Sequence, residues 1–215
     1  MKRHNIFIIF IVLFLLQSCE PAATFDQPQP VNQKSLTSFP AFLQGIYLDS
    51  NNASKIIISD EMITRHYDFD YMEHKDSLAS FYKIVNDTLM NLKDSSREII
   101  LLMGDSICHH YVGIDTLFNI SADNILKKYK GYYFLNIRYH ENAWEVKKLA
   151  LQKGLLTMGN ISIEEDVNKL KEITETLEDT ISTQFSLSKR QFKKFVKQEG
   201  FSEQETFVRV RENGQ

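Results

Sequence analysis

The segment MITRHYDFDY, residues 62–71, places a bulky side chain at every second position. These positions are Ile63, Arg65, Tyr67, Phe69 and Tyr71. Successive side chains of a β-strand point to opposite faces of a sheet, so a period of two indicates a strand. The segment therefore predicts a β-strand with two different faces, and the sequence around it follows the same pattern.

Short segments with this pattern continue from residue 42 to residue 120. Besides 62–71, we expect strands at 45–49, 55–59, 82–85, 88–92, 99–103, 106–112 and 116–120. Between them lie polar turn sequences: Asn51-Asn52, Asn86-Asp87, Gly104-Asp105 and Gly113 to Asp115. Asn, Asp and Gly tolerate the backbone conformations of tight turns, so the spacing predicts an antiparallel meander.

The first of two expected helices follows Ser162. Glu165 stands three residues later, which is the spacing of a capping box. Apolar residues then recur at helical spacing, at Val167, Leu170, Ile173 and Leu177. The pattern predicts an amphipathic helix with one buried face.

The second expected helix has clearer ends. Ser188 and Gln191 have the capping-box spacing, and Leu187 and Phe192 occupy the positions of a hydrophobic staple. Gly200 follows the last turn, where glycine often ends a helix. A final strand is expected at 205–210.

The fold class is therefore α+β, mainly an antiparallel β meander with two helices in the C-terminal half. We expect a mainly β half at 41–121 and an α+β half at 122–215. The segment 129–133 (YKGYY) echoes 43–47 (LQGIY), and 154–157 (GLLT) echoes 61–64 (EMIT). The echoes fit either two related halves or coincidence among similar strands.

Residues 19–40 are predicted to form a proline-rich tether. All four prolines of the chain lie here, at positions 21, 28, 30 and 40, among mostly polar residues. Such a composition favours extended polyproline II structure, which would hold a domain away from a membrane. The alternative is that the second half of the segment packs on the domain.

Residues 1–18 have the parts of a secretory signal. Lys2 and Arg3 precede an unbroken apolar run from Ile6 to Leu16, too short for a membrane span. The sequence Leu16-Gln17-Ser18-Cys19 resembles the lipobox of bacterial lipoproteins. The resemblance implies cleavage before Cys19 and a lipid on its sulfur, which would attach the chain to a membrane.

Composition excludes some classes of partner. Without Lys2 and Arg3 the 25 basic residues become 23, against 28 acidic ones, a net charge of −5. This acidity argues against nucleic acid as a partner. The only other cysteine, Cys108, would then have no partner within the chain, and we expect it to be buried.

We find no set of residues that catalysis would need, so we expect no enzyme and no cofactor. The sequence has no Gly-x-Ser-x-Gly, no glycine-rich phosphate loop and no His-Glu-x-x-His. His109 and His110 are adjacent in an expected strand, so they point to opposite faces and cannot share a metal ion. A hydrolase with dispersed active-site residues is the remaining enzymatic alternative.

Two further patterns mark candidate sites. A basic patch could bind an acidic partner or lipid head groups, although it also fits a solvated helix face: Lys189, Arg190, Lys193, Lys194 and Lys197. A tripeptide Asp-Ser/Thr-aliphatic occurs five times and resembles an O-glycosylation sequon of envelope proteins in one group of Gram-negative bacteria. Its acceptors would be Ser77, Thr88, Ser106, Thr116 and Thr180, although the pattern also fits turns that open strands.

The segments 127–136 (KKYKGYYFLN) and 144–148 (WEVKK) resemble those of hypothetical lipoproteins of Gram-negative envelopes. We therefore expect a non-catalytic lipoprotein, an accessory or binding module with an envelope protein as partner, at the outer rather than the inner membrane. The sequence does not define its oligomeric state. The alternative is a carrier of a small apolar ligand, since Gly45-Ile46-Tyr47 and Gly131-Tyr132-Tyr133 resemble the strand start of lipocalin-like barrels.

Overall fold

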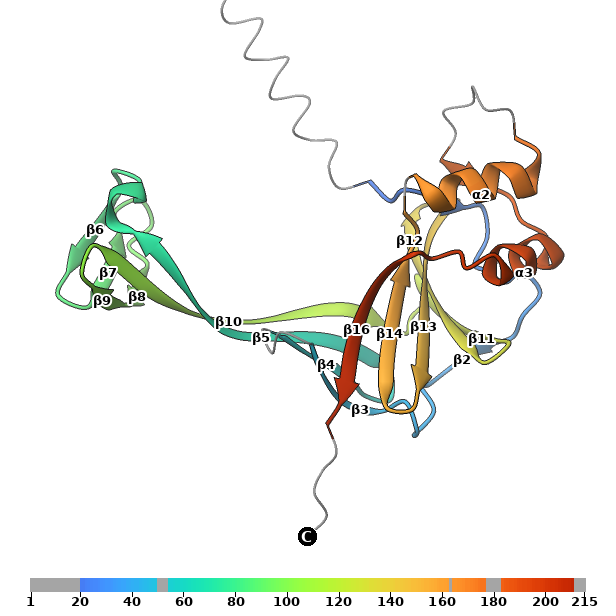
Figure 1. Ribbon diagram of the computed structural model, residues 1–215, viewed down its shortest axis with the longest axis horizontal. Helices are drawn as coiled ribbons and strands as arrows, with labels where there is room; N and C mark the ends of the chain where they lie inside the picture. The colour runs from blue at the N-terminus through green and yellow to red at the C-terminus, as the bar shows by residue number, and fades with distance from the viewer. Residues whose placement is uncertain (1–19, 50–53, 163, 177–182, 211–215) are drawn as a thin grey trace, which may run out of the picture. The chain divides into compact units, whose positions relative to one another are not determined.

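The computed structural model describes residues 20–49, 54–162, 164–176 and 183–210. The fold is α+β, mostly antiparallel sheet with two helices in the C-terminal half, as predicted (Figure 1). The chain divides into two compact units. Unit 1 takes the described residues of Met1–Ser38, Ile120–Gln152 and Thr157–Glu205, and unit 2 those of Phe39–Asn119, Lys153–Leu156 and Thr206–Gln215.

The sheet of unit 1 is a meander of β11 (Asn124–Tyr129), β12 (Tyr132–His140) and β13 (Ala143–Gln152). A two-residue turn joins the first two strands, with positive φ at both Lys130 and Gly131. Such a turn matches the twist of a hairpin. The short strand β2 (Ser35–Leu36) pairs with β11, and the residues of β14 (Leu155–Asn160) from Thr157 onward also belong to unit 1.

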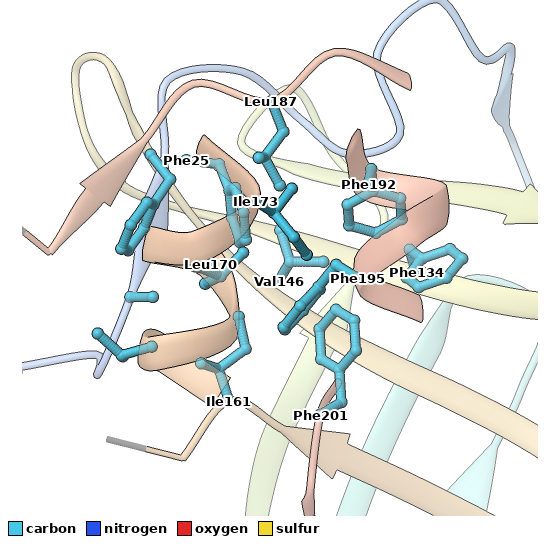
Figure 2. Close-up of a cluster of buried hydrophobic side chains, with 13 residues drawn as sticks. Phe25, Phe134, Val146, Ile161, Leu170, Ile173, Leu187, Phe192, Phe195 and Phe201 are labelled. Atoms are coloured by element: carbon cyan, nitrogen blue, oxygen red, sulfur yellow. The ribbon is translucent and has the colours of Figure 1, made fainter. Parts of the chain in front are cut away.

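Helices α2 (Glu165–Thr174) and α3 (Lys189–Lys197) bury their apolar faces in one aromatic cluster of unit 1. Figure 2 shows Leu170 and Ile173 of α2 facing Phe192 and Phe195 of α3. The rings of Phe134 and Phe192 meet edge to face with centroids 4.9 Å apart. The predicted apolar face of the first helix is thus confirmed for its described residues; Leu177 lies outside them.

The start of α3 is confirmed and its end differs from the prediction. Ser188 accepts a hydrogen bond from the Gln191 N–H, and the Gln191 side chain accepts one from the Ser188 N–H, which completes the capping box. The left-handed residue after the helix is Glu199 rather than Gly200. Gly200 donates its N–H to the carbonyl of Phe195, and a Cβ on Gly200 would lie 2.5 Å from the Phe195 ring. Glycine is therefore needed here for space.

The start of α2 also differs from the prediction. Ser162 pairs with Asp166 instead of Glu165: the Ser162 N–H donates to Asp166 Oδ2 over 3.0 Å. Asp166 is fully buried, and its Oδ2 also accepts from the N–H of Ser202 at 2.7 Å. This carboxylate joins the start of α2 to the segment after α3, which is a tertiary contact that the local spacing does not contain.

Much of the predicted tether packs into unit 1. Strand β1 (Thr24–Phe25) pairs with β13 and with β15 (Gln184–Phe185). Gln29 is fully buried, and its backbone N–H and C=O both bond to the side-chain amide of Asn136. Apolar residues such as Phe25 and the satisfied backbone of Gln29 make burial favourable here, despite the prolines.

Unit 2 is built on a continuous antiparallel sheet. Its strands are β3 (Gly45–Asp49), β4 (Ser54–Ile58), β5 (Met62–His74) and β10 (Ser106–Asn119), with the end of β16 (Glu203–Arg209) beside β3. The turn predicted at Gly113 to Asp115 is wrong, since β10 runs through it. Pairing with β5 keeps Gly113 extended, opposite Tyr67.

A small sheet lies at the far end of β5 and β10 (Figure 1). It contains β6 (Tyr82–Val85), β7 (Thr88–Asn91) and β8 (Arg97–Ile99), preceded by the short helix η2 (Lys75–Ser77). The hairpin at Asn86 is confirmed, with φ of 56°. The strand predicted at 99–103 is divided at Ile100: β8 pairs with β7, and β9 (Leu101–Met103) pairs with β10. Ile100 is buried there against Leu89 and Ile107.

The two sequence echoes occupy similar structural positions. Gly45 is the first residue of β3, and Gly131 directly precedes β12. Likewise, Glu61 directly precedes β5, and Gly154 directly precedes β14. Each echo therefore marks the start of a strand, and whether the halves are related stays a prediction.

Candidate binding surface

The predicted basic patch lies on α3. The side chains of Arg190, Lys194 and Lys197 are exposed, while those of Lys189 and Lys193 are half-buried. Two of the five cations have local partners: Lys189 donates to Gln33 Oε1 at 3.0 Å, and Lys194 lies 3.6 Å from a Glu172 oxygen. These contacts reduce the patch available to a partner, and its binding role stays a prediction.

The described candidate glycosylation sites all belong to unit 2. Thr88 and Ser106 each begin a strand directly after an Asp that ends a turn, and Ser77 ends η2. Thr116 lies within β10, is exposed and pairs with Thr64. Thr180 lies outside the described residues. Modification stays a prediction, and an intact mass equal to peptide plus lipid would contradict it.

The most distinctive surface of unit 2 is the ribbon formed by β5 and β10. Cross-strand pairs bring aromatic rings together on one face: Tyr71 with His109, and Phe69 with Tyr111. The Phe69 and Tyr111 centroids lie 5.4 Å apart, and Tyr67 lies 6.1 Å from Tyr111. We refer to Tyr67, Phe69, Tyr71, His109 and Tyr111 as the aromatic ladder. Such pairs stabilise a two-stranded ribbon, which has little stability by itself.

The two adjacent histidines each contact carboxylates, on opposite faces of the ribbon. His109 is buried, with its Nδ1 2.8 Å from a Glu98 oxygen and its ring stacked on Tyr71 at 4.7 Å. Because Glu98 belongs to β8, this bond joins the ribbon to the small sheet. His110 Nδ1 lies 2.8 Å from an oxygen of Asp70. The hydrogen bond to Asp70 raises the pKa of His110, because it stabilises the protonated ring.

The structure separates the histidines as the sequence predicted. Within the described ranges, no group of three or more His, Cys, Asp or Glu side chains is placed to hold a metal ion. Cys108 is half-buried and not fully buried as expected, with its thiol free. Neither described helix has the length and apolarity that a bilayer crossing requires.

Exposed apolar side chains gather on the ribbon and on the strands beyond it. On the ribbon, Tyr111, Val112 and Ile114 are 46%, 65% and 63% exposed. At its far end, which we call the tip (residues 75–105), Ile99 reaches 79%. Other exposed members are Leu92, Leu101, Leu102 and Met103. Val112 and Ile114 lie on the face of the ribbon opposite to Tyr111, and exposed apolar patches often mark interaction sites.

Sequence reasoning missed this surface because it ended a strand at Val112. The alternation of Tyr67, Phe69 and Tyr71 was visible, but its continuation across the ribbon required the pairing with Tyr111. The full length of β10 would have revealed the surface, but the turn expected at Gly113 ended the predicted strand too early.

Compared with protein-family models, with curated proteins and with solved structures, the chain matches none. The signal segment and Cys19 lie outside the described residues, so the predicted lipidation rests on the sequence alone. The class that the fold and this surface define is an α+β protein with a candidate binding ribbon.

Proposed function

We propose that the chain is a non-catalytic binding module of a Gram-negative cell envelope, attached to a membrane through lipid on Cys19. The lipobox-like sequence supports the attachment. The observation that carries the binding role is the exposed apolar surface of the ribbon and tip, with Ile99, Val112 and Ile114 each more than 60% exposed. Leaving such surface in water costs free energy, which a partner would recover on binding.

The apolar-ligand carrier would need an interior lined by some of Ile57, Tyr67, Phe69, Ile100 and Phe118. The positions of these residues favour the binding module instead. Ile100 is buried in the small cluster of the tip, Phe118 packs edge to face on Phe39, and Tyr67 and Phe69 belong to the aromatic ladder. They lie in three separate places of unit 2. A carrier would need them around one interior.

The attachment is tested by labelling cells with a palmitate analogue. We expect labelling of the wild type and of Cys108→Ala, and none of Cys19→Ala, which should leave the membrane fraction. Cys108→Ala is the matched control because it removes the only other thiol. Equal labelling of all three proteins would contradict the proposal.

The binding role is tested in intact cells by placing a photo-crosslinking amino acid at single positions. We expect a discrete crosslinked partner from Ile99 and Tyr111. Val208 in β16, which is 57% exposed, serves as the control. Equal yields from all three positions, or none from any, would count against a binding surface on the ribbon and tip.

A further inference from the structure

The outer edge of β10 is open over most of its length. On one side β10 pairs with β5, and on the other β9 covers only Ser106 to Cys108. Between His109 and Asn119, no other strand in the described part of the chain pairs with this side. Every second residue of such a strand turns its N–H and C=O away from its neighbour, so a row of backbone groups faces outward.

This edge lacks the usual protection against strand addition. Natural edge strands are commonly short, or carry Lys or Pro. Strand β2 has two residues and β9 has three. The open part of β10, by contrast, contains no Lys, Arg or Pro, and its bulge comes only between Thr116 and Phe118. An extended edge with unbroken register to β5 remains from His109 to Thr116, and it continues the edge on which β9 pairs.

Side chains along the edge differ between the two faces. On one face, Val112 and Ile114 are both largely exposed and offer an apolar row. On the other, Tyr111 lies over Gly113: a Cβ on Gly113 would be 2.6 Å from the Tyr111 hydroxyl. Asp115 is next on that face and is exposed. An incoming side chain opposite Gly113 would therefore meet a tyrosine ring and a carboxylate, which suits a cation.

Charge favours the same kind of partner. The two strand segments 65–73 and 107–115 contain four acidic residues and one basic residue, Arg65, which lies opposite Asp115. Of the acidic residues, Glu73 and Asp115 lie on the face of Tyr111, and Asp68 and Asp70 on the face of Val112. The net charge of the two segments is −3 with histidine neutral. A second copy of the chain, paired edge to edge, would bring two such surfaces together, whereas a basic segment would be attracted.

We propose that the edge of β10 from Tyr111 to Asp115 binds an extended segment of a partner protein as an added strand. The segment alternates Lys or Arg with apolar residues: the cations lie on the face of Tyr111 and Asp115, and the apolar side chains on the face of Val112 and Ile114. This inference rests on the proposed binding function and names its partner class. Backbone hydrogen bonds supply affinity in this mode, and the alternating side chains supply specificity.

The test uses the full chain purified in detergent and a labelled ten-residue peptide of alternating Lys and Val. We expect saturable binding by fluorescence anisotropy, weakened by salt, and no binding of the matching Glu-Val peptide. Amide hydrogen exchange supplies the second readout. Binding should protect outward amides between His110 and Thr116, and binding without such protection would overturn strand addition.

The double variant Val112→Lys, Ile114→Lys replaces the apolar row with lysines. These carry the same charge as the peptide, and lysine is typical of edge strands that resist strand addition. We expect the double variant to weaken binding by at least roughly tenfold, because like charges repel and the apolar contact is lost. Val208→Lys makes the same change at an exposed position of another strand and should bind as the wild type does. Equal loss in both proteins would overturn the assignment to β10.

Two other results would also overturn it. A dimer in sedimentation that the double variant abolishes would assign the edge to a second copy. Absence of any peptide binding would remove the inference while leaving the proposed function to its own tests, palmitate labelling and crosslinking from Ile99. Conversely, if those cellular tests fail, peptide binding by the purified chain can still be measured, so each proposal has a test of its own.

Discussion

The ammonium group of Lys127 is enclosed in unit 1, and its replacement gives a quantitative test of the packing there. Only 7% of Lys127 is exposed, and its Nζ donates to the carbonyls of Pro28 at 2.7 Å and Pro30 at 3.0 Å. Burial, and secondly the charge of Lys189, lower the pKa of Lys127 to about 8. The change Lys127→Met keeps the length of the side chain and removes the titrating group.

The direction of the pH effect follows from proton binding. Above pH 8 the folded protein releases this proton, while the unfolded chain, with a normal lysine pKa of about 10.4, retains it. The unfolded state then binds more protons, so the free energy of unfolding rises with pH. With a folded pKa of about 8, the rise between pH 7 and pH 9 is about 1.3 kcal/mol. Below pH 7 both states are protonated and this contribution is constant.

The assay is urea unfolding at pH 7 and pH 9, followed by the fluorescence of Trp144. This residue is the only tryptophan of the chain and is buried in β13 of unit 1. We expect the wild type to gain stability relative to Lys127→Met as pH rises. Lys148, whose pKa burial also lowers, is present in both proteins and cancels in the difference.

The matched control is Lys128→Met, which changes an exposed neighbour on the same strand. It should keep the pH dependence of the wild type. If Lys127→Met shows the same gain between pH 7 and pH 9 as the wild type, the enclosed ammonium does not titrate as described and the reasoning fails.

Three further substitutions in unit 1 are measured by the same urea unfolding. Asn136→Ala leaves the buried backbone groups of Gln29 unpaired and should cost about 2–4 kcal/mol, whereas a loss below about 1 kcal/mol would contradict this role of Asn136. Gly200→Ala places a Cβ 2.5 Å from the Phe195 ring and should cost about 1–3 kcal/mol; an unchanged midpoint would show that space is not limiting. Ser188→Ala removes the cap of α3 and should cost about 1 kcal/mol, with restoration by Ser188→Asp expected.

Local sequence determined those elements whose cause lies within a few residues. The alternation of Tyr67, Phe69 and Tyr71 defined a strand, since the period of side chains is a property of the backbone itself. Ser188 and Gln191 likewise defined the start of α3, because both partners of a capping box lie within one turn. The hairpin at Asn86 follows the same principle, as do the fold class and the expectation that His109 and His110 point apart.

The candidate binding surface depended on contacts between distant residues. Gly113 reads as a turn in isolation, yet pairing with Tyr67 holds it in a strand and leaves room for the ring of Tyr111. Whether the edge of β10 is open depends on which strands lie beside it, and no local sequence pattern contains that information. The division at Ile100 has the same origin, since burial against Leu89 and Ile107 decides where β8 ends.

The sequence by itself determined the α+β class, the strand pattern around 62–71, the N-terminal cap of α3 and a lipobox-like start. The tertiary structure alone decided that Gln29 is buried against Asn136, that Asp166 pairs with Ser162 and Ser202, and that β10 leaves an edge uncovered. The physical reason is the distance along the sequence over which each interaction acts. Backbone periodicity and capping act over a few residues, whereas burial and strand pairing join groups that are far apart in the sequence, such as Gln29 and Asn136, which are 107 positions apart.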